Sequence, residues 1–123
     1  MDRPLKILAV DDEPSVTLSL RYVFAGPGYE VTCVGDGDAA LGRLNTVSDP
    51  YDVIIVDEKM PNLNGVELVN EIKKRGISGK IIVVAAHLSS ETREAFERMD
   101  VHEMFSKPFD VAVLRSAVDS LVT

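Results

Sequence analysis

Four charged side chains of this sequence each follow an apolar stretch, at the point where a strand would end. Carboxylates held within a few ångströms repel one another unless they are protonated or bridged by a cation. Mg²⁺ prefers one or two carboxylates together with waters and phosphate oxygens. A lysine adds a compact positive charge that can meet a phosphate-sized anion beside the metal. The residues with these types and positions are Asp11, Asp12, Asp57 and Lys107.

Asp57 is the candidate nucleophile of this group. Residues 53–56 before it are four consecutive β-branched apolar residues, a run typical of a strand buried on both faces. Residues 60–65 after it contain Pro, Asn and Gly and predict a loop. A carboxylate at this point could take up a phosphoryl group as an aspartyl phosphate. Mg²⁺ and Lys107 would then neutralise the charge on the transferring oxygens.

Each of these residues, taken alone, has an ordinary structural explanation. A carboxylate often marks the end of a strand, and an acidic doublet or a lysine before a proline is common without any function. Their joint position at the ends of the expected first, third and fifth strands favours chemistry over that explanation.

The spacing of the apolar residues predicts five strands that alternate with five helices. This alternation is typical of a parallel α/β sheet with right-handed crossovers and helices on both faces. The carboxyl ends of its strands share one edge, where ligands bind. Ser89 or Ser90 and Asp110 are the expected caps of the last two helices. Strands are expected at residues 6–10, 29–34, 53–56, 81–86 and 104–106, and helices at about 14–24, 38–45, 66–75, 90–99 and 111–121.

Composition limits the class of protein. The 123 residues suit one domain, and the net charge of −7 argues against a nucleic-acid-binding surface, which would normally be basic. The single cysteine, Cys33, excludes an internal disulfide, suits a reducing compartment and is expected to fill an apolar strand. No apolar run is long enough to span a membrane, and the first residues do not open a signal peptide. These features predict a cytoplasmic protein.

Three motifs follow one another along the chain: Asp11-Asp12, Asp57 with Met60-Pro61 and Gly65 behind it, and Lys107-Pro108-Phe109. They resemble the receiver domain of two-component response regulators, in the right order and spacing over essentially the whole chain. The resemblance implies one receiver domain over residues 1–123 with a flavodoxin-like, doubly wound five-stranded sheet in the order 2-1-3-4-5 and five helices. It implies that a histidine kinase or a histidine phosphotransfer protein donates a phosphoryl group to one aspartate with Mg²⁺.

The resemblance further implies a role for each site residue. Asp12 and Asp57 would bind Mg²⁺ directly, Asp11 would help through a water, and the backbone carbonyl of Lys59 would complete the protein ligands. Lys107 would hold a phosphoryl oxygen. Lys59 and His87 stand at positions that influence how fast the family's phosphoryl group is lost to water, although a role as plain surface residues explains each of them equally well.

Two residues depart from the family's pattern. Ala85 stands at the end of the fourth strand, where the family has Thr or Ser, and Met104 stands three residues before Lys107, where it has an aromatic residue. The neighbouring Phe105 is expected in the core rather than as a relocated switch. Because the hydroxyl and the aromatic ring form the family's usual switching relay, we expect this chain to switch weakly on phosphorylation.

Two other functions compete with the phospho-accepting receiver. A receiver-like module that binds partners without phosphate would explain the missing relay but not the retained acidic residues and lysine. An aspartyl-phosphate phosphatase would share the nucleophile, but it would need a cap domain and a second carboxylate where Lys59 stands. We therefore expect a signalling domain that takes part only in its own phosphotransfer and autodephosphorylation, not an enzyme. The sequence names no output partner or effector domain.

Overall fold

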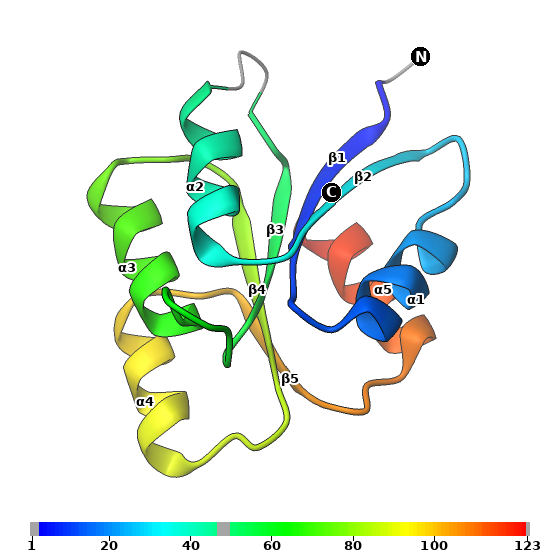
Figure 1. Ribbon diagram of the computed structural model, residues 1–123. Coiled ribbons are helices and arrows are strands. Elements are labelled where there is room, and N and C mark those ends of the chain that lie inside the picture. Colours follow the sequence, from blue (N-terminus) through cyan, green and yellow to red (C-terminus); the bar gives the residue numbers. More distant parts are fainter. Residues whose placement is uncertain (1–2, 47–49, 123) are drawn as a thin grey trace.

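The computed structural model describes residues 3–46 and 50–122. Within them, strands and helices alternate without exception, which confirms the expected five of each (Figure 1). The elements follow in the order β1 (Leu5–Val10), α1 (Pro14–Val23), β2 (Tyr29–Val34), α2 (Gly37–Thr46), β3 (Val53–Asp57), α3 (Gly65–Lys74), β4 (Lys80–Ala85), α4 (Ser90–Arg98), β5 (Glu103–Ser106) and α5 (Val111–Leu121).

All strands pair in parallel, in the order β2-β1-β3-β4-β5. This is the doubly wound, flavodoxin-like order that the resemblance implied. The strand order reverses between β1 and β3, so the carboxyl ends of these two strands form the expected site edge. β3 lies at the centre of the sheet and all five of its residues are buried, as its run of β-branched residues predicts.

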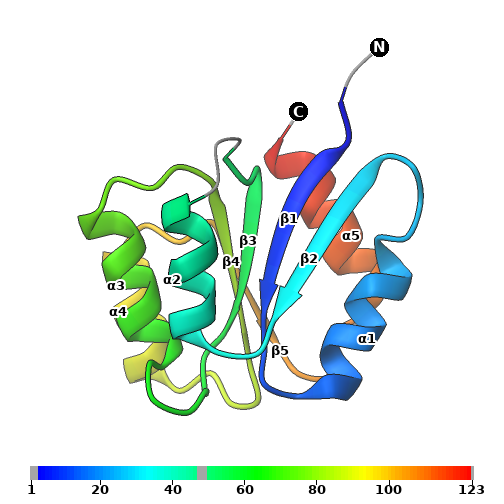
Figure 2. The ribbon, with the colours of Figure 1, turned by 45° about the horizontal axis from the view of Figure 1, so that its top comes forward.

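Helices cover both faces of the sheet and separate two apolar clusters (Figure 2). Alternate residues of β1, β3 and β4 point to opposite faces, because successive side chains of a strand alternate. One cluster joins the sheet to α2, α3 and α4, and the other joins it to α1 and α5. The fully buried helix residues of the two clusters include Leu68, Val69, Ile72 and Phe96 on the first face and Leu20, Leu114 and Val118 on the second.

The helix starts agree with the capping signals in the sequence. Pro14 is the first residue of α1, where the missing N–H costs nothing. Ser89 caps α4, and Asp110 caps α5 by accepting backbone hydrogen bonds. Asn64 and Glu67 form a capping box at the start of α3. These caps place the helix N-termini close behind the loops that carry the site.

The boundaries of the last two strands differ slightly from the expected ones. β4 ends at Ala85, so Ala86, which was expected in the strand, is exposed beyond it. β5 begins at Glu103, one residue earlier than expected. In β5, Met104 packs against the cluster of α2, α3 and α4, and Phe105 packs against the opposite cluster. Phe105 is thus a partly buried core residue as expected, and Cys33 of β2 packs on the same side.

No helix in the described residues is long and apolar enough to cross a bilayer.

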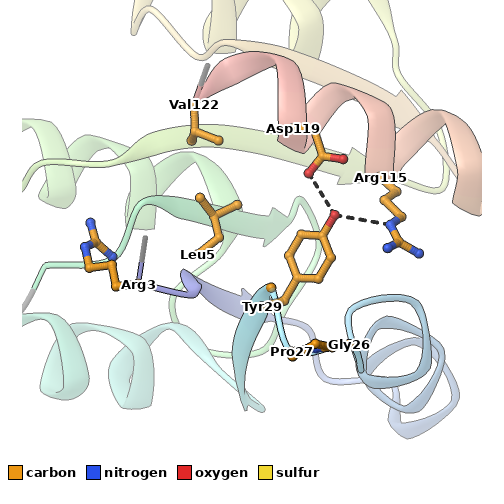
Figure 3. Close-up of a pocket in the computed structure, with 9 residues that line it drawn as sticks. Arg3, Leu5, Gly26, Pro27, Tyr29, Arg115, Asp119 and Val122 are labelled. Atoms are coloured by element: carbon orange, nitrogen blue, oxygen red, sulfur yellow. Dashed lines mark hydrogen bonds between the residues drawn. The ribbon is translucent and has the colours of Figure 1, made fainter. Parts of the chain in front are cut away.

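The edge of the sheet opposite the strands' carboxyl ends contains a polar link between β2 and α5. The Tyr29 hydroxyl donates to Asp119 Oδ1 at 2.8 Å and accepts from Arg115 Nε at 3.2 Å (Figure 3). The Tyr29 ring also packs edge-on against Phe24, with 5.0 Å between ring centroids. This link lines a pocket of about 410 Å³ and holds α5 against the sheet away from the site.

Candidate functional site

Three carboxylates gather where β1 and β3 end. Val10 of β1 pairs with Val56 of β3, so the residues that follow them, Asp11 and Asp57, lie side by side. One oxygen from each of Asp11, Asp12 and Asp57 lies within 4.8 Å of the other two. Asp11 and Asp57 are each only 3% exposed, whereas Asp12 is open to solvent. The cluster is therefore half buried and can be reached from outside.

Lys107 reaches this cluster from beyond the edge strand β5. Its backbone N–H donates to the carbonyl of Ala85 at 2.7 Å, which holds the loop after β5 against the end of β4. Its Nζ lies 3.1 Å from Asp11 Oδ2 and 3.1 Å from Asp57 Oδ1. The four residues selected from the sequence are thus brought together at one edge of the sheet.

Glu13 also belongs to the cluster and was not selected from the sequence. Its Oε1 accepts a hydrogen bond from Lys107 Nζ at 2.8 Å, and its backbone N–H donates to Asp11 Oδ1 at 2.9 Å. The available signal was its place directly after Asp11-Asp12 and before Pro14, the first residue of α1. That signal does not reveal a contact with a lysine 94 positions away.

The cluster carries more negative charge than its lysine balances. Burial and the negative charge of Asp11 raise the pKa of Asp57 from 3.8 to about 6, although Lys107 opposes this shift. Burial by itself lowers the pKa of Lys107, but attraction to Glu13, Asp11 and Asp57 outweighs it and raises the pKa above its usual value. Lys107 is therefore a permanent cation, while Asp57 is costly to ionise without further positive charge.

The unsatisfied oxygen of Asp11 fits a divalent cation. Asp11 Oδ1 accepts the Glu13 N–H, whereas Oδ2 is buried and, among the described residues, has only its 3.1 Å ion pair with Lys107 Nζ. A buried polar atom without a hydrogen bond requires an explanation. Three carboxylates offer only oxygen ligands, the set that Mg²⁺ prefers. The donor set is therefore compatible with Mg²⁺.

The loop after β3 is held close to the site by a glycine. Gly65 N–H donates to the Glu58 carbonyl at 2.9 Å. A Cβ at Gly65 would lie 2.7 Å from the Asp57 carbonyl oxygen and 2.8 Å from Glu58 Cα, which is too close for any other residue. The start of α3 therefore packs directly on the backbone of Asp57.

The remaining sequence-selected positions lie in β4, in β5 and in the loops after β3 and β4. Ala85 is fully buried at the end of β4 and pairs with Ser106, and Met104 pairs with Val83. Lys59, two residues after Asp57, is exposed, and so is His87, two residues after the end of β4. The roles assigned to these residues from the sequence stay predictions.

Comparisons with known proteins agree with this geometry. A family model described as the response regulator receiver domain matches residues 7–119. The response regulator MprA of Mycolicibacterium vanbaalenii is 32% identical over 97% of this chain and 51% of its own length. Sporulation initiation phosphotransferase F of Bacillus subtilis is 29% identical over 92% of this chain and 90% of its own. The chain thus spans about half the length of the first of these relatives.

Solved structures show the same architecture. The receiver domain of the Francisella response regulator 1452 superposes with a TM-score of 0.87 at 30% identity, over 95% of each chain. The response regulator TrrA of Thermotoga maritima, solved with Mg²⁺ and BeF, superposes with a TM-score of 0.80 at 33% identity, over 94% of this chain and 97% of its own.

Proposed function

The chain belongs to the receiver-domain family of two-component response regulators, and we propose that Asp57 is its phosphoryl acceptor. The phosphoryl donor is the phosphohistidine of a sensor histidine kinase or of a histidine phosphotransfer protein. The observation that carries this proposal is the convergence of Asp57, two further carboxylates and the Lys107 ammonium at one accessible edge of the sheet.

Each residue of the cluster has a separate task in the transfer. A carboxylate oxygen of Asp57 attacks the phosphorus, an O–P bond forms, and the N–P bond to the donor histidine breaks with its electron pair leaving on nitrogen. Lys107 donates to a phosphoryl oxygen. Asp11, Asp12, Asp57 and the Lys59 carbonyl would hold Mg²⁺. When bound, Mg²⁺ neutralises charge on the transferring oxygens.

The consequence of phosphorylation is a changed protein-binding surface. Ala85 and Met104 lack the hydroxyl and the ring of the usual relay, so a phosphorylation-independent interaction module is the second candidate. The raised pKa of the buried Asp57 carboxyl group favours the phospho-accepting receiver over this module.

We further propose that residues 1–123 form one receiver domain in the cytoplasm without direct contact to nucleic acid. The phosphoaspartate hydrolyses on the domain itself, and Lys59 and His87 influence its lifetime.

The test is covalent labelling by a small phosphodonor. Acetyl phosphate with Mg²⁺ should add one phosphoryl group to the wild-type chain, as an acyl phosphate that base removes. Asp57→Asn keeps the shape of the side chain and removes the nucleophile, so labelling should be lost. Asp38→Asn removes an exposed carboxylate from the first turn of α2 and should label as the wild type does. Equal labelling of Asp57→Asn would place the acceptor elsewhere.

A further inference from the structure

The ammonium of Lys107 is already engaged in the unphosphorylated structure. Its Nζ lies 2.8 Å from Glu13 Oε1, closer than the 3.1 Å to Asp11 Oδ2 and Asp57 Oδ1. The contact with Glu13 has hydrogen-bond geometry, and the contacts with the two aspartates are ion pairs. Lys107 is therefore surrounded by three carboxylates, and its shortest contact is with Glu13.

Glu13 is the partner of Lys107 that can leave at least cost. Its side chain is 57% exposed, against 2% for Asp11 and 4% for Asp57. It occupies the N-cap of α1 without making a side-chain capping bond, so Lys107 is the described partner of its carboxylate. Water can solvate the carboxylate once this hydrogen bond opens, whereas the two aspartates have little access to water.

We propose that Glu13 is a placeholder for the phosphoryl group, a positioning residue that holds Lys107 until a phosphoryl oxygen takes over its hydrogen bond. The inference rests on the proposed function of Asp57. An ammonium has three donors, and three carboxylate oxygens already lie within 3.1 Å of Nζ. A phosphoryl oxygen therefore reaches Nζ by displacing one of them, and Glu13 is the one that leaves at least cost. Glu13 therefore competes with the phosphoryl group for Lys107, and removing its carboxylate strengthens binding of a phosphoryl group.

The size of this effect follows from the exposure of Glu13. Ion pairs with an exposed partner contribute little, because water screens them and solvates the separated charges. Loss of the ion pair between Glu13 and Lys107 should therefore change the affinity for a phosphoryl group by about two- to fivefold. The direction of the change separates this role from a structural one, since loss of a merely supporting contact would weaken binding.

The experiment measures binding of beryllofluoride, a phosphoryl mimic, to the whole chain at saturating Mg²⁺, by NMR titration. Glu13→Gln removes the charge, and we expect about two- to fivefold tighter binding. Glu13→Asp keeps the charge but shortens the side chain, and an aspartate at an N-cap accepts backbone N–H groups of the helix. It should therefore release Lys107 and also bind more tightly. Glu30→Gln, an exposed position on β2, controls for net charge and should bind as the wild type does.

The outcomes separate this inference from the function on which it rests. Unchanged or weaker binding by Glu13→Gln would overturn the placeholder role while leaving Asp57 as acceptor. Tighter binding by Glu13→Gln but not by Glu13→Asp, or an equal gain in Glu30→Gln, would show a general effect of charge and would also overturn it. A wild-type chain that binds no beryllofluoride and is not labelled by acetyl phosphate would instead refute the proposed function, and the inference with it.

Discussion

At the scale of single residues, the site is defined by carboxylates that the fold does not fully neutralise. Asp57 is almost completely buried beside Asp11, and one oxygen of Asp11 has no hydrogen-bond partner within residues 3–46 and 50–122. Lys107 is the only cation in the described ion pairs of these two aspartates, and it also forms an ion pair with Glu13. The unliganded domain therefore contains unfavourable electrostatic energy that a cation or a proton can remove.

This strain predicts a pH-dependent effect of neutralising Asp57 when divalent cations are chelated. The folded pKa of about 6 lies above the ordinary 3.8, so the folded chain binds this proton more tightly than the unfolded chain does. The resulting stability is complete below about pH 4 and is lost as the pH rises through 6. At pH 8, Asp57→Asn should therefore be more stable than the wild type by up to about 3 kcal/mol, since one pKa unit corresponds to about 1.4 kcal/mol.

Urea denaturation in the presence of a chelator, at several pH values, measures this difference. The advantage of Asp57→Asn should shrink between pH 8 and pH 4, because the wild-type carboxyl group becomes protonated in the folded state. A difference that stays the same across this range would show that the ionisation of Asp57 is not strained.

At the scale of elements, the ends of β4 and β5 determine how a phosphoryl group could be sensed. Ala85 offers no hydroxyl to the site, and Met104 packs its side chain against the α2, α3 and α4 face. A ligand shifts a conformational equilibrium only through contacts that differ between the two states. These two positions therefore predict weak coupling between the site and the surface formed by α4, β5 and α5.

Restoring both partners should strengthen this coupling. A hydrogen bond to a charged group contributes roughly 1.5–3 kcal/mol, which is about a ten- to hundredfold change in population. Ala85→Thr with Met104→Tyr should enlarge the beryllofluoride-dependent NMR shifts over that surface more than the two single changes added together. Ala85→Val with Met104→Tyr has the same shape without the hydroxyl and should not. A full shift in the wild type would show that the relay is dispensable.

The contact between the start of α3 and the end of β3 gives a second prediction for the elements. Gly65→Ala would place a Cβ 2.7 Å from the backbone oxygen of Asp57, so the loop must move. Backbone shifts forced by added atoms typically cost about 1–3 kcal/mol. We expect a lower urea midpoint and slower labelling of Asp57 by acetyl phosphate. Gly42→Ala, on α2 with open space around its Cβ, is the control and should be neutral or stabilising.

At the scale of the whole molecule, binding at the site edge should stabilise the entire domain. β1 and β3, which end in the cluster, lie in the middle of the sheet and contribute to both apolar clusters. Unfolding therefore separates the carboxylates. A ligand that binds only the folded chain raises its stability in proportion to the logarithm of ligand concentration over the dissociation constant.

Mg²⁺ should accordingly raise the melting temperature of the wild-type chain. Asp12 is exposed and lies outside the core, so Asp12→Ala should fold normally but bind Mg²⁺ at least about tenfold more weakly, as expected for loss of a charged ligand. Its melting temperature should respond correspondingly less. Calorimetric titration measures the affinity, with Asp38→Asn as the control. Equal affinity of the wild type and Asp12→Ala would contradict a metal site formed by these residues.

The order of the elements and the residues at the strand ends could be predicted from the amino-acid sequence without the structure. Apolar periodicity, caps and loop residues act over a few neighbouring positions. The β-branched run before Asp57 therefore predicted the buried strand, and Asp110 predicted the start of the last helix. The parallel α/β architecture then placed Asp11, Asp12, Asp57 and Lys107 at one edge. The order of the strands came from the family resemblance, because local patterns do not encode which strands pair.

The way in which Lys107 is shared among the carboxylates became known only from the folded structure. The hydrogen bond between Glu13 and Lys107 joins residues 94 positions apart, and it depends on where α1 begins and how the loop after β5 crosses the end of β4. The unsatisfied oxygen of Asp11 results from the same geometry, since the backbone of Glu13 binds its other oxygen. Hydrogen bonds depend on distance and direction, and neither can be read from residue type or spacing.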